Sequence, residues 1–451
     1  MLWSLAEAAQ RLGARLTGNG EVRPTSLSLD TRTLAPGACF VALRAERDGH
    51  AFAAQAVEKG AAALLVDHEL PLPCPQLIVE DTLVALQAWG QGRLAQVAPS
   101  QVFGITGSVG KTSTKELLAA ATGAWKTPGN RNNTLGLPEA LATLPDATRA
   151  VVLEMGMSTP GEIRRLTEIA PLDYGLITMI GTAHIENFSE GQQGIARAKG
   201  ELVAALKPGG AWAHLAADGW CRWIAQQPWA SHARPLPVGP NEPWGWTNAR
   251  SLGAQGEAFT LVTPHGRAEV RLKLRGAHQV RNAALAGALA VAAGHDLERV
   301  TEGLGSVEPE PGRGRLHALR HGGWLLDETY NASPDSILAC AATLLDMEGG
   351  EMVAVLGSMR ELGEEAARIH IETGEALRRM GVSRVWAYGD HAKDLVRGFG
   401  SGLAFATFEA LGDALEAVPL NGRILVKGSR FWRAERVVAW LLEKDGSDSR
   451  S

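Results

Sequence analysis

The sequence predicts an α/β protein of three domains. Its 451 residues are enough for several hydrophobic cores. Short apolar runs rich in β-branched residues alternate with helix-forming segments along most of the chain, and such alternation is typical of parallel sheets. The alternation falls into three blocks, and we expect domains at residues 1–95, 96–314 and 315–451.

The first block predicts a small α/β domain. Its opening segment, "MLWSLAEAAQRLG", predicts a short amphipathic helix and lacks the basic segment of a signal peptide. Two runs typical of strands follow, "CFVAL" (39–43) and "AALLV" (62–66), on either side of the helical stretch "HAFAAQAVEKG". The turn-rich segment "DHELPLPCP" comes next.

The second block predicts a mostly parallel sheet that binds its ligand at the carboxyl ends of the strands. The runs "VFGIT", "AVVLEM" (150–155) and "YGLITMI" (174–180) have the length and composition of strands, and each precedes a turn and a helical segment. Around residues 240–275, "EAFTLVTPHGRAEVRLKL" predicts antiparallel strands, and the alanine-rich "GAHQVRNAALAGALAVAAG" predicts a helix. We expect a hinge at "EPEPGRGR" (308–315).

The third block repeats the strand–helix rhythm. Four runs are typical of buried strands, and each is followed by helix-forming sequence: "GWLLDE", "MVAVLG" (352–357), "RVWAYG" (384–389) and "RILVKG" (423–428). A second, Rossmann-like sheet is therefore expected.

Composition excludes several classes of protein. A net charge of −5 gives no electrostatic footprint for nucleic acid. The four cysteines are scattered without a C-x-x-C pair, which argues against a zinc site and a disulfide framework and fits a reducing compartment. No run approaches the roughly 18 apolar residues of a membrane span. We expect a cytoplasmic protein that binds no nucleic acid.

The stretch "GSVGKTSTK" (107–115) has the pattern of a phosphate-binding loop. A strand, a glycine turn and a helix start present backbone N–H groups and a positive dipole end to an anion. Lys111 would lie over the β- and γ-phosphates, and the Thr112 hydroxyl would bind Mg²⁺. The strict P-loop pattern is not met, because Ile105 occupies the position of the first glycine. The stretch predicts nucleotide binding and leaves the reaction open.

Three further residues indicate a second metal ion. Glu154 and His184 follow strand-like runs, and Lys199 lies in a helical stretch. Taken singly, the glutamate could be solvated and the histidine packed. Together they predict an acid and an imidazole at the carboxyl ends of neighbouring strands. A nucleotide switch needs one carboxylate for its metal, so additional ligands favour a two-metal site.

Nearly the whole chain, from about residue 28 to 437, resembles the Mur ligases of bacterial cell-wall synthesis. The motifs that carry the resemblance are "TGSVGKTSTK", "NRNNTLGLP", "LEMGMSTPGEI", "GTAHIENF", "AKGE", "GAHQVRNAALA", "PGRGRL", "LLDETYNASPDS" and "LVKGSR". "YNASPDS", "VLGSMRELGEE" and the N-terminal "LDTRTLAPGACF" are similar to the subfamily that adds D-alanyl-D-alanine to UDP-N-acetylmuramoyl-tripeptide. The resemblance implies a UDP-substrate domain, a central ATPase domain and a C-terminal domain that closes on the site.

The resemblance also implies the site residues. The catalytic set would be Lys111, Glu154, His184, Lys199 and Arg315. Two Mg²⁺ ions would be held by Thr112, Glu154, His184 and Lys199, the last as a carbamate. ATP would contact Gly107, Ser108, Val109, Gly110, Lys111, Thr112, Ser113, His278, Asn282, Arg313, Asp327 and Glu328. The sugar-peptide substrate would contact Asp30, Thr31, Arg32, Asp48, Asn130, Asn132, Asn133, Tyr330 and Asn331.

Several points stay open at this stage. Gln279 and Ser358 depart from the family's asparagine and aspartate, and either Asp327 or Glu328, and either Arg313 or Arg315, could meet the nucleotide. The implied reaction passes through an acyl phosphate and ADP, and neither its amine-deprotonating base nor the third residue of the tripeptide is identified. Alternatives are a muramyl ligase that adds one amino acid, a folylpolyglutamate synthase, or a P-loop switch or transport ATPase. We expect a monomer.

Overall fold

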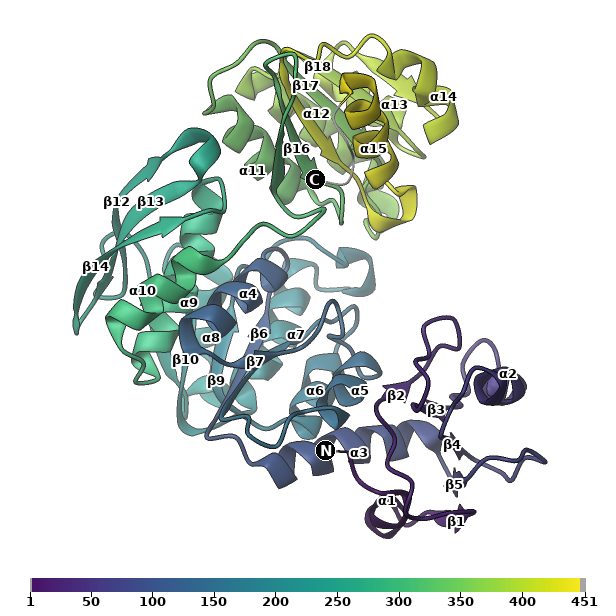
Figure 1. Cartoon of the computed structure of the whole chain (residues 1–451). Coiled ribbons are helices and arrows are strands. Elements are labelled where there is room, and N and C mark those ends of the chain that lie inside the picture. The colour runs from purple at the N-terminus through teal and green to yellow at the C-terminus, as the bar shows by residue number, and fades with distance from the viewer. Residues whose placement is uncertain (1, 447–451) are drawn as a thin grey trace.

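The computed structural model describes residues 2–446, which form four sheets with their helices (Figure 1). The N-terminal sheet has the order β1-β5-β4-β3-β2, and only the β1–β5 pair is antiparallel. Its strands are β1 (Arg15–Thr17), β2 (Leu27–Ser28), β3 (Cys39–Val41), β4 (Ala63–Val66) and β5 (Gln76–Ile78). Its helices are α1 (Leu5–Leu12), η1 (Gly49–Phe52), α2 (Ala53–Glu58) and α3 (Thr82–Val97).

Local chemistry sets the ends of these helices. α1 begins with a reciprocal capping box between Ser4 and Glu7 and ends at Gly13, whose φ of 64° is left-handed. The Asp81 carboxylate caps α3 through the backbone N–H groups of Leu83 and Val84. The boundary expected at residue 95 falls inside α3, and this helix packs on both α1 and α5.

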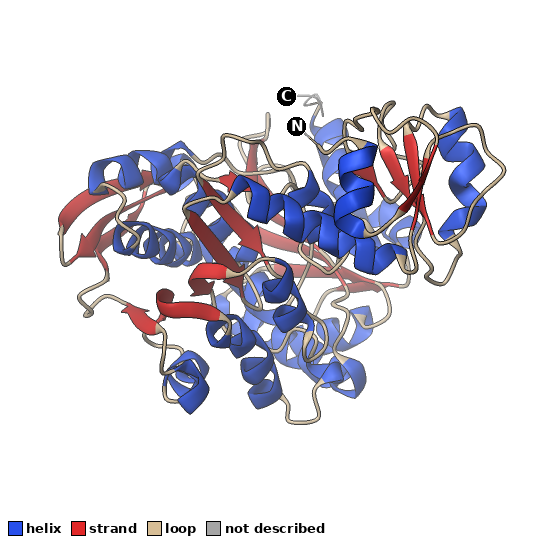
Figure 2. Ribbon diagram, turned by 90° about the horizontal axis from the view of Figure 1, so that it is seen from below, coloured by secondary structure: helices blue, strands red, loops and turns tan. Residues whose placement is uncertain are grey.

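The central sheet is fully parallel, with the order β11-β10-β9-β6-β8-β7. Its strands are β6 (Gln101–Thr106), β7 (Trp125–Lys126), β8 (Ala150–Glu154), β9 (Leu172–Ile177), β10 (Leu206–Leu215) and β11 (Arg234–Val238). The accompanying helices are α4 (Lys111–Thr122), α5 (Gly136–Ala142), α6 (Glu162–Ile169), η2 (Ile185–Asn187), α7 (Gln192–Ala204), α8 (Gly219–Ala225), η3 (Pro228–Ala230), α9 (Ala277–Ala292) and α10 (Leu297–Ser306). Helices cover both faces, so each face has its own apolar core (Figure 2).

The predicted antiparallel insert is confirmed. β12 (Gly245–Ser251), β13 (Glu257–Thr263) and β14 (Gly266–Leu272) form a three-stranded sheet, with η4 (Gly253–Gln255) between the first two. The Pro264–His265 turn joins β13 to β14. The sheet packs on α9 and α10, which explains why an alanine-rich helix is buried along almost its whole length.

The C-terminal sheet has the order β15-β16-β20-β17-β18-β19, and β15 alone runs antiparallel to its neighbour. Its strands are β15 (Arg315–Ala318), β16 (Trp324–Glu328), β17 (Met352–Gly357), β18 (Arg384–Tyr388), β19 (Leu403–Phe405) and β20 (Arg423–Lys427). Its helices are α11 (Pro334–Leu345), η5 (Gly363–Glu365), α12 (Ala366–Met380), α13 (Ala392–Phe399), α14 (Phe408–Leu415), η6 (Arg430–Trp432) and α15 (Glu435–Asp445). All four predicted strands of this block are present.

Two further observations bear on the expectations from sequence. The segment expected to be a hinge lies in the connection between α10 and β15, and its mobility stays a prediction. Within residues 2–446, no helix combines the length and apolarity that a membrane crossing requires.

Candidate active site

The phosphate loop, Gly107–Gly110, lies between β6 and α4, as predicted. Gly107 has a φ of 150°, and a Cβ there would lie 1.8 Å from Thr178 Oγ1. Gly110 has a φ of 86°, and its Cβ would lie 2.9 Å from Asn282 Oδ1. The Thr178 hydroxyl donates to the Val109 carbonyl at 2.5 Å. The two glycines therefore allow close packing against β9 and α9 in backbone conformations that other residues adopt rarely.

Lys111 folds back over the loop that precedes it. Its Nζ donates to the Gly107 carbonyl at 2.7 Å and to the Ser108 carbonyl at 3.4 Å. Burial lowers the Lys111 pKa, while the carboxylates of Glu154 and Glu361 act in the opposite direction. The first N–H groups of α4, at Lys111–Ser113, lack acceptors within the helix, as at every helix start. Lysine charge and helix N–H groups thus converge on one position suited to an anion.

Glu154 is the centre of a buried polar group. It ends β8 with 2% of its surface exposed, and its Oε2 accepts from the Thr112 hydroxyl at 2.9 Å. Its Oε1 accepts from Asn132 Nδ2 at 2.8 Å. Hydroxyl and carboxylate oxygens are ligands that Mg²⁺ prefers, so Thr112 and Glu154 together fit the predicted metal. The contact with Asn132 attaches the predicted substrate loop to this site.

Lys115 is a site residue to which the sequence analysis gave no role. Its side chain is 1% exposed, its Nζ donates to the Gly129 carbonyl at 2.8 Å, and it lies 3.6 Å from Glu154 Oε2. The lysine thereby connects α4 to the segment that carries Asn130, Asn132 and Asn133. Lys115 follows Lys111 by one helical turn, and this spacing was a signal that the second lysine faces the same site.

The prediction that Glu154 and His184 end neighbouring strands is wrong. β6 lies between β8 and β9, and His184 follows β9 only after a loop, in a left-handed conformation with a φ of 62°. Among the described residues, no hydrogen bond or ion pair joins His184 to Glu154. The imidazole Nδ1 lies instead 2.8 Å from Oε2 of Glu361, a residue of the C-terminal block. A role for His184 as a metal ligand stays a prediction.

Lys199 lies in α7, as predicted, and is 1% exposed. Burial and then the positive charge of Lys111 lower its pKa well below the usual range for lysine. Within residues 2–446, its Nζ makes no hydrogen bond or ion pair. The shift favours the neutral amine over the charged form, and the neutral amine is the form of lysine that acts as a nucleophile.

The first turns of α9 meet the phosphate loop. Asn282 lies against Gly110, and its Nδ2 donates to Gln279 Oε1 at 3.2 Å. Gln279, which departs from the family pattern, thus orients Asn282. His278 is one turn earlier, and burial lowers its pKa to about 4. The sequence predicted both His278 and Asn282 near the nucleotide, and the structure brings Asn282 to the loop.

The predicted arginines occupy different positions. The Arg313 guanidinium lies over the Tyr330 ring, 3.6 Å from its centroid. Arg315 is the first residue of β15, in register with Asp327 of β16. Asn331 accepts from the backbone N–H of Ala332 beside this ring. Which arginine meets phosphate stays a prediction.

Both candidate acids of β16 are engaged within the protein. Asp327 accepts from the Gly312 N–H at 3.0 Å and from the Thr329 hydroxyl at 2.7 Å, so it holds the 312–314 turn in place. Glu328 pairs with the buried Lys427, with 3.2 Å between Oε2 and Nζ. The negative charge of Glu328 raises the Lys427 pKa, although burial acts in the opposite direction.

The residues expected at the sugar-peptide end lie on four segments, one of which carries Tyr330 and Asn331, described above. Asp30 pairs with Arg32 at 2.6 Å on the surface, and the buried Thr31 donates to Gln55. Asp48 caps η1 through the His50 N–H. Asn133 accepts from two backbone N–H groups at the start of α5, and Asn130 is exposed. Because α5 packs on β2, the asparagine loop and the segment after β2 lie on neighbouring elements.

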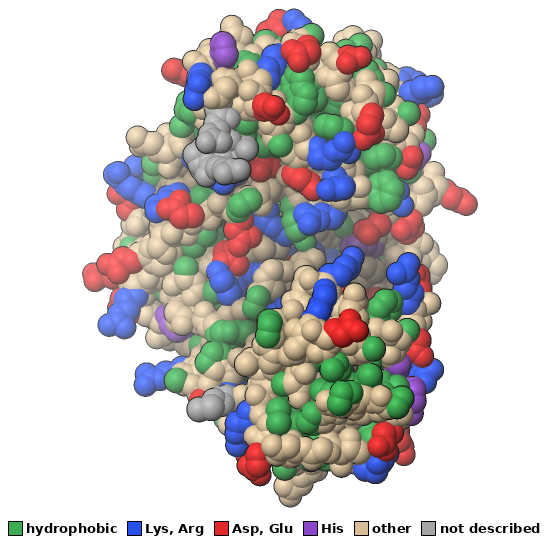
Figure 3. Space-filling model, turned by 45° about the vertical axis from the view of Figure 1, so that its right-hand side comes forward, with side chains coloured by type: hydrophobic (Ala, Val, Ile, Leu, Met, Phe, Trp, Pro, Cys, Tyr) green, Lys and Arg blue, Asp and Glu red, His purple; other side chains and the backbone are tan. Residues whose placement is uncertain are grey.

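The C-terminal block contacts the central block beside the site. A Cβ on Gly181 would lie 2.9 Å from Asp335 Oδ2, and one on Gly363 would lie 2.8 Å from the Glu186 Cβ. The nearby His184 ring lowers the Glu361 pKa, whereas burial raises the Asp335 pKa. Lys and Arg side chains gather across the middle of the face seen in Figure 3. Nothing in the sequence indicated which C-terminal carboxylates reach the central block.

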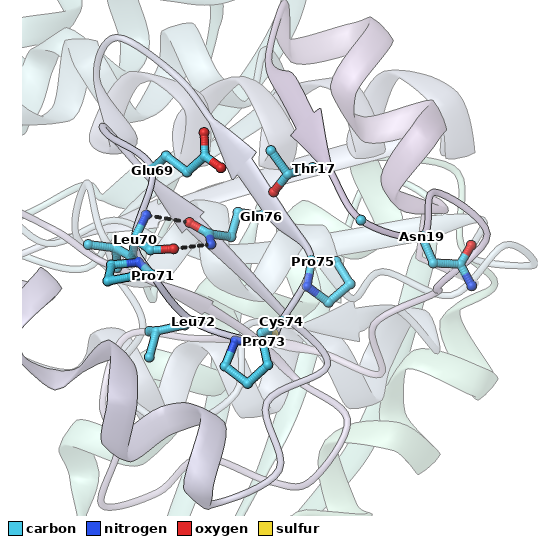
Figure 4. Close-up of a pocket in the computed structure, with 11 residues that line it drawn as sticks. Thr17, Asn19, Glu69, Leu70, Pro71, Leu72, Pro73, Cys74, Pro75 and Gln76 are labelled. Carbon is cyan, nitrogen blue, oxygen red and sulfur yellow. Dashed lines mark hydrogen bonds between the residues drawn. The ribbon is translucent and has the colours of Figure 1, made fainter.

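A surface cavity of about 600 Å³ lies apart from this site, against β1 and β5. Gln76 bonds to both the N–H and the carbonyl of Leu70 and closes the proline-rich loop that lines the cavity (Figure 4). None of the predicted site residues lines it. The cavity therefore has no part in the candidate active site.

Comparison with known proteins identifies the family and the fold. Residues 105–290 match the Mur ligase middle domain, and residues 314–430 match the Mur ligase glutamate ligase domain. The UDP-N-acetylmuramoyl-tripeptide–D-alanyl-D-alanine ligase of Escherichia coli is 37% identical over 94% of this chain and 96% of its own length. A crystal structure of MurF from Acinetobacter baumannii has a TM-score of 0.90 at 32% identity, covering 98% of this chain and 99% of that one.

A crystal structure of MurF ligase from Thermotoga maritima in complex with ADP has a TM-score of 0.79 at 26% identity. It covers 93% of this chain and 98% of that one. These similarities confirm the predicted three-domain α/β fold. On the domain matches and the near-complete coverage of its relatives, this chain belongs to the Mur ligase family.

Proposed function

We propose that this protein joins D-alanyl-D-alanine to UDP-N-acetylmuramoyl-tripeptide in an ATP-dependent, ADP-forming reaction that yields the pentapeptide precursor of peptidoglycan. One observation carries the proposal. Glu154 accepts hydrogen bonds from both Thr112, which follows the phosphate loop, and Asn132, in the asparagine loop, so the phosphate site and the expected substrate loop meet at one carboxylate. The Escherichia coli relative is named for this activity, and its similarity covers 94% of this chain.

The chain's own residues supply positioning and charge. Lys111 and the first N–H groups of α4 hold the β- and γ-phosphates while the tripeptide carboxylate attacks the γ-phosphorus, and the bond to ADP breaks. Mg²⁺, when held by Thr112 and Glu154, supplies further positive charge to the transferring phosphoryl group. The acyl phosphate formed on the substrate is then attacked by the amine of D-alanyl-D-alanine, and phosphate leaves.

We propose that Lys199 is carbamylated and that two Mg²⁺ ions bind. A buried neutral amine can add CO₂: an N–C bond forms, a proton leaves, and a carbamate anion results. With Glu154 and His184, its oxygens would complete a second cation site. With Nδ1 in contact with Glu361, His184 would offer its Nε2 to the metal.

We propose the cytoplasm as the compartment, because ATP and a nucleotide-linked sugar are the substrates. A monomer suffices, because one chain supplies every residue named above.

A panel of acceptors tests the proposal against its alternatives. ADP release should require D-alanyl-D-alanine together with UDP-N-acetylmuramoyl-tripeptide, with either meso-diaminopimelate or lysine as the third residue. A single amino acid or glutamate on folate as the productive acceptor would favour another family member. Hydrolysis that is independent of any acceptor would favour a nucleotide switch.

A further inference from the structure

The loop after β17 extends a carboxylate into the central block. Glu361 adopts a left-handed backbone with a φ of 63°, which is uncommon for a residue other than glycine. Its Oε2 lies 2.8 Å from His184 Nδ1, although 55% of the Glu361 side chain is exposed. The carboxylate is therefore held beside the proposed reaction centre and is open to a ligand.

A cation and an apolar ring lie next to this carboxylate. The Arg360 guanidinium lies over the Phe431 ring, 4.3 Å from its centroid, and 63% of Phe431 is exposed. The ion pair of Arg360 with Asp390 is long, at 3.7 Å, and both partners are largely exposed, so the guanidinium can exchange partners. These residues follow the carboxyl ends of β17 and β20, where open parallel sheets bind ligands.

We infer that Glu361, Arg360 and Phe431 bind the acceptor dipeptide, an inference that rests on the proposed function. A short zwitterionic peptide needs an anion for its α-ammonium and a cation about 7 Å away for its carboxylate, the reach of two extended residues. The charges of Glu361 and Arg360 interact, and the two side chains are consecutive in the chain. The exposed Phe431 ring offers the apolar surface for the methyl groups.

The orientation of the dipeptide follows from the position of Glu361. The acyl phosphate forms at the phosphate loop, and the attacking nitrogen must reach it. Glu361 is the member of the group in contact with the central block, through His184. Glu361 therefore binds the α-ammonium, and Arg360 binds the terminal carboxylate.

Steady-state kinetics of the full-length protein with ATP, Mg²⁺ and both substrates tests the role of Glu361. Glu361→Gln should raise KM for D-alanyl-D-alanine about 10- to 100-fold, the range for loss of a charge-assisted hydrogen bond. KM values for ATP and the UDP-tripeptide should stay within about twofold, which also shows that the variant is folded. Glu364→Gln, a neighbouring exposed carboxylate in η5, is the matched control and should leave all three KM values unchanged.

The C-terminal amide of the dipeptide tests the role of Arg360. The wild-type protein should lose about 10-fold or more in kcat/KM when the dipeptide carboxylate becomes an amide. Arg360→Met should show the same loss with the dipeptide itself and no additional loss with the amide. Arg379→Met, in the last turn of α12, is the control and should discriminate between the two acceptors as the wild type does.

Two results would overturn the inference alone. One is a wild-type KM for the dipeptide in Glu361→Gln; the other is an equal rise in all three KM values, which would make the His184–Glu361 pair a contact for domain closure. If the losses in kcat/KM from Arg360→Met and from the dipeptide amide add together, Arg360 does not bind the dipeptide carboxylate. A wild-type protein that forms no product from D-alanyl-D-alanine would overturn the proposed function as well.

Discussion

Acidification from pH 7 to pH 4.5 should destabilise the protein through one histidine, His278. This side chain lies at the start of α9, and burial lowers its pKa from 6.5 to about 4. Arg281 and Lys427 act in the same direction, and Glu328 opposes them. Glu328 and Lys427 belong to the C-terminal sheet, and because they shift the pKa in opposite directions, burial remains the main cause of the low value.

The sign follows from proton binding. Between pH 4 and 6.5 the unfolded chain binds more protons at this position than the folded protein, so the free energy of unfolding falls as the pH decreases through this window. At about 1.4 kcal/mol per pH unit, the full effect is about 3 kcal/mol, and at pH 4.5 about 2.5 kcal/mol of it is reached.

Urea unfolding of the wild type and of His278→Gln at both pH values isolates this contribution. Other groups titrate equally in the two proteins, so the wild type should lose about 2 kcal/mol more than the variant between pH 7 and 4.5. A difference below about 0.5 kcal/mol would refute the reasoning, as would an NMR titration of His278 with a midpoint near 6.5.

Three further substitutions test the site. Lys111→Ala should reduce ADP formation by about 10³-fold or more while the free energy of unfolding changes little, because its charge acts mainly on the transferring phosphoryl group; a coupled ADP assay measures the first quantity and urea unfolding the second. Gly107→Ala should destabilise the phosphate loop and weaken ATP binding, because its Cβ would lie 1.8 Å from Thr178 Oγ1. Lys199→Ala should lose most activity and regain part of it with added acetate, which would replace carbamate oxygens.

Each of these outcomes has a contrary result. Near-normal ADP release from a folded Lys111→Ala variant would show that residues 107–110 are not the phosphate-binding loop. Wild-type ATP affinity in Gly107→Ala would show that the loop can shift away from Thr178. Rescue of Lys199→Ala by a small amine and not by acetate would indicate a cationic lysine instead of a carbamate.

Features that depend on local sequence could be predicted. Apolar runs gave the strands β6, β8, β9 and β17, because buried parallel strands need continuous apolar sequence. The glycines of the phosphate loop and the lysine after them gave the anion site, because their roles follow from backbone conformation and charge. Lys199 was placed on a helix, and its burial then explained a shifted pKa.

Features that depend on the order of strands in a sheet could not be predicted from the sequence. Nothing local to Glu154 or His184 shows that β6 separates their strands, because strand order is set by crossovers between distant segments. For the same reason, the approach of Glu361 to His184 and of Asp335 to Gly181 is invisible in the sequence. The spacing of Lys115 from Lys111 indicated a shared helix face, but only tertiary packing shows that this lysine reaches Glu154.

Oxygen transfer tests the central claim, that ATP activates a carboxylate, most directly. UDP-N-acetylmuramoyl-tripeptide labelled with ¹⁸O in the reacting carboxylate would be incubated with the protein, ATP, Mg²⁺ and D-alanyl-D-alanine, and the released phosphate analysed by mass spectrometry. An acyl phosphate predicts one ¹⁸O atom in each phosphate and one amide bond per ADP. Unlabelled phosphate released along with ADP would contradict the account, because it would mean that water had attacked ATP.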